Sequence, residues 1–277
     1  MFVFTHFPCD DGKLAGLVWL SRFPNSTINN WIHGDSQMIK MLQFDSSEKI
    51  VFLDVCPNIL YLNPNNNYLI IDHHENAINS IKAHQSSNIE LFVDTKYSGC
   101  MLTWMYCYGN KPFPKIINHI GKKDIWDFSD HDTEPYCIGF NEVIINEVII
   151  NEVITKLLFD DTNDLHNIFI ENGKKLINKY IQEAAQIFKN YKVEDNIIEI
   201  TLHSHNNVLY KYLIEYAQLN FPDYDILRIG YPSIHIDGIY NYSLRSLKDH
   251  IRVDSIARQY GGNGHPKAAG YNIILTL

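Results

Sequence analysis

The sequence predicts an α/β protein in which a mostly parallel-sheet N-terminal domain is joined by a long helix to a smaller α/β C-terminal domain. Short apolar runs alternate with stretches of helical periodicity over residues 2–108, an order typical of parallel sheets covered on both faces. A long helical pattern follows in mid-chain, and strand-like segments then begin again. The length of 277 residues also exceeds what one core usually organises.

The expected elements follow in chain order. In a first domain at residues 1–160 we expect strands at residues 2–5, 27–32, 50–55, 67–71 and 89–93, and helices at residues 12–23, 36–42, 99–108 and 112–122. Residues 165–192 have helical periodicity and predict a linker helix within residues 161–192. For a second domain at residues 193–277 we expect strands at residues 197–202, 224–229 and 239–244, helices at residues 208–219 and 253–260, and a closing strand.

Residues 141–154 repeat the sequence Asn-Glu-Val-Ile-Ile twice and end in Asn-Glu-Val-Ile. A five-residue period advances about 140° per unit around a helix, so no single face stays apolar. Solenoid units are much longer, about 20 residues or more. We therefore interpret the repeat as an insertion within a helix that has no chemistry of its own.

Composition limits the kind of partner. A hydrophobic content of 45% and a charged content of 20% are ordinary for a globular protein. The net charge of −9 argues against a long duplex nucleic acid, which needs a basic stripe. An odd number of cysteines, five, without a Cys-x-x-Cys pair predicts reduced thiols and a cytoplasmic location. We find no signal peptide and no apolar run of 18 residues, and therefore expect no membrane partner.

Three predicted strands end in side chains that can bind metals. Residues 2–5 lead into His6, followed by Cys9, Asp10 and Asp11, and the strand at residue 50 leads into Asp54. The apolar run at residues 67–71 ends in Asp72-His73-His74. The carboxyl ends of parallel strands form the ligand edge of an open α/β sheet. Carboxylate and imidazole groups gathered there predict a metal site.

Two later segments add candidates. We expect Asp124 on a strand-like or loop segment; a carboxylate at a helix end beside lysines is the alternative. Near the C-terminus, Gly261, Gly262 and Gly264 surround Asn263, and consecutive backbone amides there can form an anion-binding nest. The side chains next to this turn that could hold a phosphate are His265, Lys267 and Arg245.

In this order and spacing, the motifs resemble the DHH phosphoesterase superfamily. The resemblance rests on residues 6–12, Asp54, Asp72-His73-His74 and Asp124-Ile125-Trp126. Residues 243–246 followed by residues 261–270 are similar to the signature of the DHH-associated C-terminal domain. That second signature points to the branch of nanoRNases, oligoribonucleases and single-strand exonucleases.

The resemblance implies a metal-dependent phosphohydrolase that cleaves phosphodiester bonds of short oligonucleotides or similar small nucleotides in the cleft between its domains. A hydroxide activated by two divalent ions would attack phosphorus. The ions are expected to be Mn²⁺, with Mg²⁺, Co²⁺ or Zn²⁺ as alternatives. The implied metal ligands are His6 and Asp54 at the first ion, with Cys9 near it, and Asp11, Asp54, His73 and Asp124 at the second. Asp54 and His74 would be the catalytic residues, and Arg245, Gly262, Gly264, His265 and Lys267 would bind substrate.

Cys9 departs from the family pattern, because many relatives have an acidic residue at its position. The thiolate could bind metal, Asp10 could replace it, or the first ion could bind weakly. A tight bond to sulfur would favour Zn²⁺. We expect Cys9 to lie near the metal and Asp10 to face solvent, because an extended segment reverses faces at each residue.

Other functions remain open from the sequence alone. The chain could be a phosphomonoesterase for a nucleoside 3',5'-bisphosphate, a catalytically inactive DHH-fold scaffold, or a non-enzymatic metal-binding protein. All six residues on which the motifs depend are present, which favours an enzyme: His6, Asp11, Asp54, His73, His74 and Asp124. The sequence also leaves a homodimer open.

Overall fold

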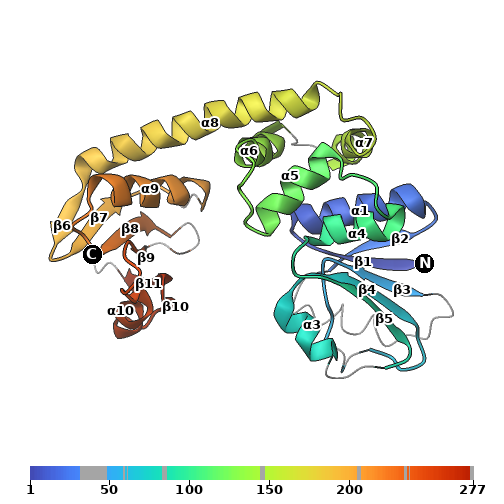
Figure 1. The fold of residues 1–277 in the computed structure, drawn as a ribbon. Helices are drawn as coiled ribbons and strands as arrows, with labels where there is room; N and C mark the ends of the chain where they lie inside the picture. The colour runs from blue at the N-terminus through green and yellow to red at the C-terminus, as the bar shows by residue number, and fades with distance from the viewer. Residues whose placement is uncertain are drawn as a thin grey trace. The chain divides into compact units, whose positions relative to one another are not determined.

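The computed structural model of the protein describes residues 1–31, 49–58, 60, 62–82, 86–143, 147–204, 207–233, 236 and 238–274. Its contacts divide the chain into two compact units, Met1–Lys174 and Lys175–Leu277 (Figure 1). Each unit contains one β-sheet. No described helix is both long enough and apolar enough to cross a membrane.

The first unit is built on a five-stranded sheet in the order β2-β1-β3-β4-β5. Its strands are β1 (Phe2–His6), β2 (Thr27–Trp31), β3 (Ile50–Leu53), β4 (Tyr68–Asp72) and β5 (Ile89–Val93). Every neighbouring pair is parallel. The expected parallel sheet is confirmed.

Two apolar layers cover the sheet, and the central strands supply both of them. Every residue of β3 is buried. Val51 and Leu53 join one apolar cluster, whereas Ile50 and Phe52 join another. Successive strand side chains point to opposite faces, so a strand buried on both faces must be apolar throughout. This burial explains the unbroken apolar runs in the sequence.

The helices of the first unit are α1 (Asp10–Arg22), α3 (Glu75–Lys82), α4 (Gly99–Tyr108), α5 (Lys115–Asp124), α6 (Thr133–Val143) and α7 (Glu147–Leu157). Helices α1 and α4 pack side by side (Figure 1). The helix expected at residues 99–108 has those bounds in the structure, whereas α3 and α6 were not predicted. The helix expected at residues 36–42 and the last residue of the strand expected at 27–32 lie outside the described residues.

Two sequence-based expectations about this unit are wrong. Asp124 is the last residue of α5 and does not belong to a strand or loop, so the alternative, a carboxylate at a helix end beside lysines, is the one that the structure shows. The repeat does not lie within one helix: it covers the end of α6 and most of α7. Residues 144–146 lie outside the described part of the chain.

Helix α8 (Leu165–Ile187) is followed by a single 3₁₀ turn (Phe188–Asn190) and passes from the first unit into the second. Within the first unit it packs closely on α6. A Cβ atom at Gly173 would lie 1.8 Å from the carbonyl oxygen of Pro135, and one at Gly139 would lie 1.9 Å from that of Phe169. Two glycines therefore let the two backbones touch.

The second unit is a mixed six-stranded sheet in the order β10-β11-β9-β8-β7-β6. Strands β7 and β8 are parallel, and the other neighbouring pairs are antiparallel. The bounds are β6 (Lys192–Glu194), β7 (Ile197–Thr201), α9 (Asn207–Asn220), β8 (Ile226–Pro232), β9 (Ile239–Ser246), α10 (Val253–Gln259), β10 (Asn263–His265) and β11 (Ala268–Ile274). Strands β6 and β10 were not predicted, since three residues are too few to show a period.

Candidate metal centre

Three neighbouring strands of the parallel sheet end in polar side chains. His6 is the last residue of β1, Asp54 directly follows β3, and Asp72 is the last residue of β4. These strands are adjacent, and the pairing of Leu53 with Ile71 brings Asp54 and Asp72 to neighbouring positions. The sheet topology therefore gathers these side chains at its carboxyl edge, where open α/β sheets place their ligands.

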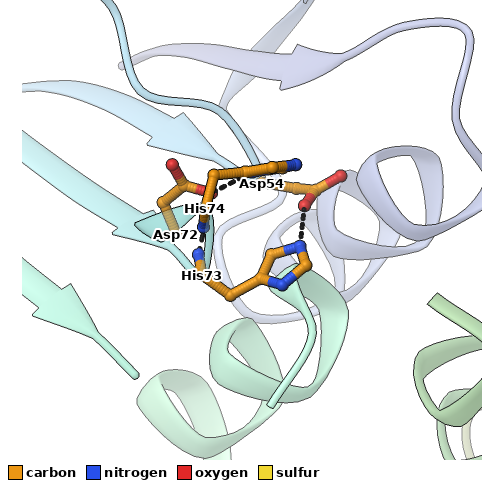
Figure 2. A group of neighbouring side chains, drawn as sticks. All are labelled: Asp54, Asp72, His73 and His74. Atoms are coloured by element: carbon orange, nitrogen blue, oxygen red, sulfur yellow. Dashed lines mark hydrogen bonds and ion pairs between the residues drawn. The ribbon is translucent and has the colours of Figure 1, made fainter. Parts of the chain in front are cut away.

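Asp54 contacts an imidazole on each side. Its Oδ2 is 3.4 Å from His6 Nδ1, and its Oδ1 is 3.1 Å from His73 Nε2, which points toward it in Figure 2. Only 1% of the Asp54 side chain is exposed. Its φ of 58° lies in the left-handed region, which aspartate tolerates better than most side chains. A carboxylate so placed can be shared by two cations.

Two further carboxylates approach the same imidazole. Asp124 Oδ2 at the end of α5 lies 3.1 Å from His73 Nε2, and Asp11 lies in the first turn of α1. Three overlapping groups have all their ligand atoms within 4.8 Å of one another: His6, Cys9 and Asp54; Asp11, His73 and Asp124; and Asp54, Asp72, His73 and His74. The structure thus brings all six expected metal ligands into neighbouring groups.

The amino end of α4 supports both buried carboxylates. Asp11 Oδ1 accepts hydrogen bonds from Ser98 Oγ at 2.7 Å and from the Cys100 amide at 3.2 Å. Gly99 lies against Asp54, and a Cβ atom at this glycine would be 2.3 Å from Asp54 Cβ. Our sequence reasoning missed the support from these residues. The available signal was Ser98 directly before a helical pattern, a typical helix start.

Gly12 lies against the end of β1. A Cβ atom there would be 2.4 Å from the carbonyl oxygen of His6. The missing side chain lets α1 pack against the end of β1, which places Asp11 and His6 in the same region.

Asp72 fixes the orientation of His74. The buried Asp72 Oδ1 accepts a hydrogen bond from the His73 amide at 2.8 Å and lies 2.8 Å from His74 Nδ1 (Figure 2). Because a carboxylate only accepts hydrogen bonds, Nδ1 is the donor. The His74 side chain is 46% exposed, so a phosphate can reach it.

Several buried polar atoms of the centre lack a well-oriented hydrogen bond. Among them are Asp11 Oδ2, both carboxylate oxygens of Asp54, and His73 Nε2. Buried polar groups normally have partners, and leaving one without a partner costs about 1–3 kcal/mol. Bound divalent cations would satisfy carboxylate oxygens and an imidazole nitrogen together. These residues therefore fit a metal centre.

Burial and neighbouring charges shift several pKa values. Burial raises the pKa of Asp11 far above its usual value, and Asp54 and Asp124 raise it further. Burial also raises the pKa of Asp54, but the facing imidazoles of His6 and His73 outweigh it and lower that pKa to about 2. Burial lowers the pKa of His73, whereas Asp124 and Asp54 raise it to about 10. Metal binding would therefore displace protons from Asp11 and His73.

The side chains of the consecutive residues Cys9 and Asp10 lie in different surroundings. Cys9 precedes α1 and belongs to the group with His6 and Asp54. Burial, followed by Asp54, raises the pKa of its thiol to about 12. Asp10 is 38% exposed and lies 4.0 Å from Lys123 Nζ. Cys9 is therefore the residue that adds a ligand atom to this group.

The expected substrate-binding residues lie in the second unit. Asn263 to His265 form β10, so the expected nest is a short β-hairpin in the structure. Gly262 and Gly264 allow close strand packing: their Cβ atoms would lie 2.1 Å from Gly270 O and 2.4 Å from Ala269 Cα. The two glycines thus serve the hairpin.

The pairing aligns His265, Ala268 and Arg245 in one row across β10, β11 and β9. Directly paired residues share a face of the sheet. Arg245 lies over the Tyr210 ring, 5.2 Å from its centroid. Lys267 Nζ donates to the carbonyl oxygen of Lys248 at 2.7 Å and lies 3.1 Å from Asp249 Oδ1. Arg245 therefore shares a face of the sheet with the exposed His265.

No family model matches the chain. The uncharacterized protein R106 of Acanthamoeba polyphaga mimivirus is 29% identical over 210 residues, which are 76% of this chain and 48% of the relative. The match thus spans about half the length of this curated relative.

Two solved structures are similar over nearly the whole chain. The pGpG-specific phosphodiesterase PggH from Vibrio cholerae has a TM-score of 0.58 at 15% identity, covering 99% of this chain and 94% of the other. CDC45 from Entamoeba histolytica has a TM-score of 0.51 at 8% identity, covering 99% and 92%. At these identities the likeness shows the fold alone. Together with the Asp72-His73-His74 motif at the carboxyl end of β4, it shows that this chain has the fold of the DHH phosphoesterase superfamily.

Proposed function

We propose that the protein is a metal-dependent phosphohydrolase that cleaves phosphodiester bonds in short oligonucleotides or similar small nucleotides. The observation that carries this proposal is Asp54, whose buried carboxylate lies between His6 and His73 and joins two ligand groups. A shared carboxylate between two sets of ligands suits a pair of divalent ions. The likeness to PggH, a phosphodiesterase, supports the same class of reaction.

The ligand sets suggest which ion is used. Asp11, His73 and Asp124 offer carboxylate oxygens and one imidazole nitrogen, a set that suits Mn²⁺. Two such ions would supply an activated water and positive charge beside the scissile phosphate. We therefore propose Mn²⁺ for the second position.

His74 would act directly on the phosphate. Its hydrogen bond to Asp72 raises the pKa of the imidazole, which favours the charged ring. Nε2 could then donate a proton or hydrogen bond to a phosphate oxygen. Asp72 touches no substrate in this proposal; it holds Nδ1 and leaves Nε2 free of that hydrogen bond.

The C-terminal unit would bind the remainder of the substrate. His265 and Arg245 share a row of the sheet, with Ala268 between them, and a small residue there leaves room for a phosphate. Only one or two phosphates would need such contacts, which suits a chain of net charge −9. Short single strands are therefore proposed as substrates in preference to long duplexes.

The test compares Asp54 with Asp10, an exposed carboxylate that belongs to none of the ligand groups. The protein would be stripped of metal, reloaded with Mn²⁺, and offered di- to pentaribonucleotides, cyclic dinucleotides, a nucleoside 3',5'-bisphosphate and polyphosphate. We expect the linear oligonucleotides to be cleaved. The products would be separated and identified by chromatography. Asp54→Ala should abolish cleavage and metal binding, because neither ion would keep its ligands, whereas Asp10→Asn should retain both.

Either of two results would contradict the proposal. Full activity of Asp54→Ala would remove this carboxylate from the mechanism. Failure of the parent protein to hydrolyse any of these substrates, despite tight binding of two ions, would instead indicate a metal-binding or scaffold protein.

A further inference from the structure

Two of the groups of potential metal ligands near Asp54 contain different kinds of ligand atom. One consists of carboxylates and an imidazole: Asp11, His73 and Asp124. The other contains a sulfur atom: His6, Cys9 and Asp54. Oxygen ligands suit Mg²⁺ and Mn²⁺, whereas thiolate selects softer ions such as Zn²⁺. The two groups therefore prefer different metal ions.

Cys9 differs in its surroundings from the other four cysteines. Cys100, Cys137 and Cys107 pack into one apolar cluster, and Cys56 packs against another. These four behave as small hydrophobic residues. The sulfur of Cys9 instead lies within 4.8 Å of a His6 nitrogen and an Asp54 oxygen.

Asp54 provides independent support for a ligand at this point. Its side chain is 1% exposed, and neither oxygen makes a well-oriented hydrogen bond. Three protein ligands from Cys, His and carboxylate, with one open position, are typical of catalytic zinc. Ligand atoms around a tetrahedral Zn²⁺ lie about 3.3–3.8 Å apart for bonds of about 2.0–2.3 Å. Small side-chain movements would therefore close the group around one ion.

We infer that the centre binds two different ions: a thiophilic ion of the Zn²⁺ class on the thiolate of Cys9 with His6 and Asp54, and a harder ion of the Mn²⁺ class on the carboxylate side. The inference rests on the two-metal site of the proposed function. It assigns Cys9 as the residue that determines the metal specificity of the first position.

Co²⁺ is the probe for the first test, because its bond to a thiolate gives a near-ultraviolet charge-transfer absorption. The metal-stripped full chain would be titrated with Co²⁺. We expect the absorption to saturate at one equivalent and to disappear when Zn²⁺, but not Mn²⁺, is added. Cys9→Ser and Cys9→Asp should lack the absorption. Cys107→Ser, a change at a similarly half-buried cysteine, should keep it.

The two Cys9 variants should differ in how they bind metal. Cys9→Ser should weaken Zn²⁺ binding more than about 100-fold, since loss of a direct ligand exceeds the effect of losing an outer partner. Cys9→Asp should still bind two ions and prefer Mn²⁺ at both positions. Thermal unfolding would establish that each variant is folded.

A second measurement uses only the parent protein. Alkylation by iodoacetamide, followed by mass spectrometry, should show that Zn²⁺ protects Cys9 and that Mn²⁺ does not, with Cys56 and Cys107 as internal references. Two bound ions without the thiolate absorption, or the same absorption in Cys9→Ser, would overturn the inference. The absorption in a protein that hydrolyses nothing would support it while contradicting the proposed function. Hydrolysis without the absorption would do the reverse.

Discussion

The metal centre and the C-terminal hairpin prepare their functional groups in different ways. Asp11 and Asp54 are each 1% exposed and are held by neighbours before any ligand arrives. His265 lies exposed on a strand of three residues, and Lys267 is paired with Asp249. A buried centre loses function when its supports move, whereas an exposed surface loses only the contact that is removed. The two regions should therefore respond very differently to mutation.

Among changes that leave every metal ligand in place, the largest effect is expected from Gly99→Ala. The added Cβ atom would lie 2.3 Å from Asp54 Cβ, so the carboxylate must move although it keeps its chemical identity. A displacement of about 1 Å can cost about 100-fold in rate. We expect at least this loss in turnover, together with loss of two-ion binding measured by calorimetry.

Gly109→Ala is the matched control, because this glycine ends the same helix. Its φ is 64° and a Cβ atom there would meet nothing within 4 Å. The substitution should cost about 1–2 kcal/mol of folding stability and leave metal affinity unchanged. Normal metal binding by Gly99→Ala would contradict the prediction that Gly99 supports Asp54. An equal loss of metal affinity in Gly109→Ala would show that the loss comes from general destabilisation of the helix.

The difference between the two regions also explains what the sequence could predict. The run that ends in Asp72-His73-His74 is readable because burial on both faces makes β4 uniformly apolar and polar residues then follow abruptly. The topology of parallel strands supplies the rest of that edge. By contrast, the contact of Gly99 with Asp54 depends on how α4 packs on the sheet, and no local pattern records it. β10 was missed because a three-residue strand is shorter than any detectable period.

A smaller, substrate-dependent effect is expected from His265→Ala. If this side chain contacts a substrate phosphate, its loss removes one charge-assisted hydrogen bond, about 1.5–3 kcal/mol or roughly ten- to hundred-fold. Turnover of a trinucleotide should fall by that factor with metal affinity intact. A small chromogenic phosphodiester should be affected less, because it lacks the additional phosphate.

His250→Ala is the control for this prediction, since His250 is exposed in the same unit but lies outside the hairpin. It should leave both substrates unaffected. Equal losses on the trinucleotide and the small ester would show that His265 acts at the scissile bond or on the fold, and the proposed division of labour between the units would be wrong.

Only a small effect on function is expected when one repeat unit, residues 146–150, is removed. Helix α7 packs against α1, which carries Asp11, so a route to the centre exists. Among the side chains of α7 and its C-terminal end that the structure describes, Ile154, Leu157 and Leu158 are buried in the core, and they follow the deleted unit in the chain. The packing contacts of these three side chains can persist in the shortened protein. Changes at separated sites usually affect stability independently, to within about 0.3–0.5 kcal/mol. Metal affinity should thus stay within about two-fold, as measured by calorimetry.

Ile154→Ala provides the comparison for that deletion, because it removes a side chain that is 2% exposed. The cavity should cost about 2–5 kcal/mol and lower the melting temperature more than the deletion does. Both variants should retain the ligand set, since neither change touches it. If the shortened protein remains folded but binds no metal, the repeat must position α1. Its role as an inert insertion would then be rejected, and the support of the centre would extend from α4 through α1 to α7.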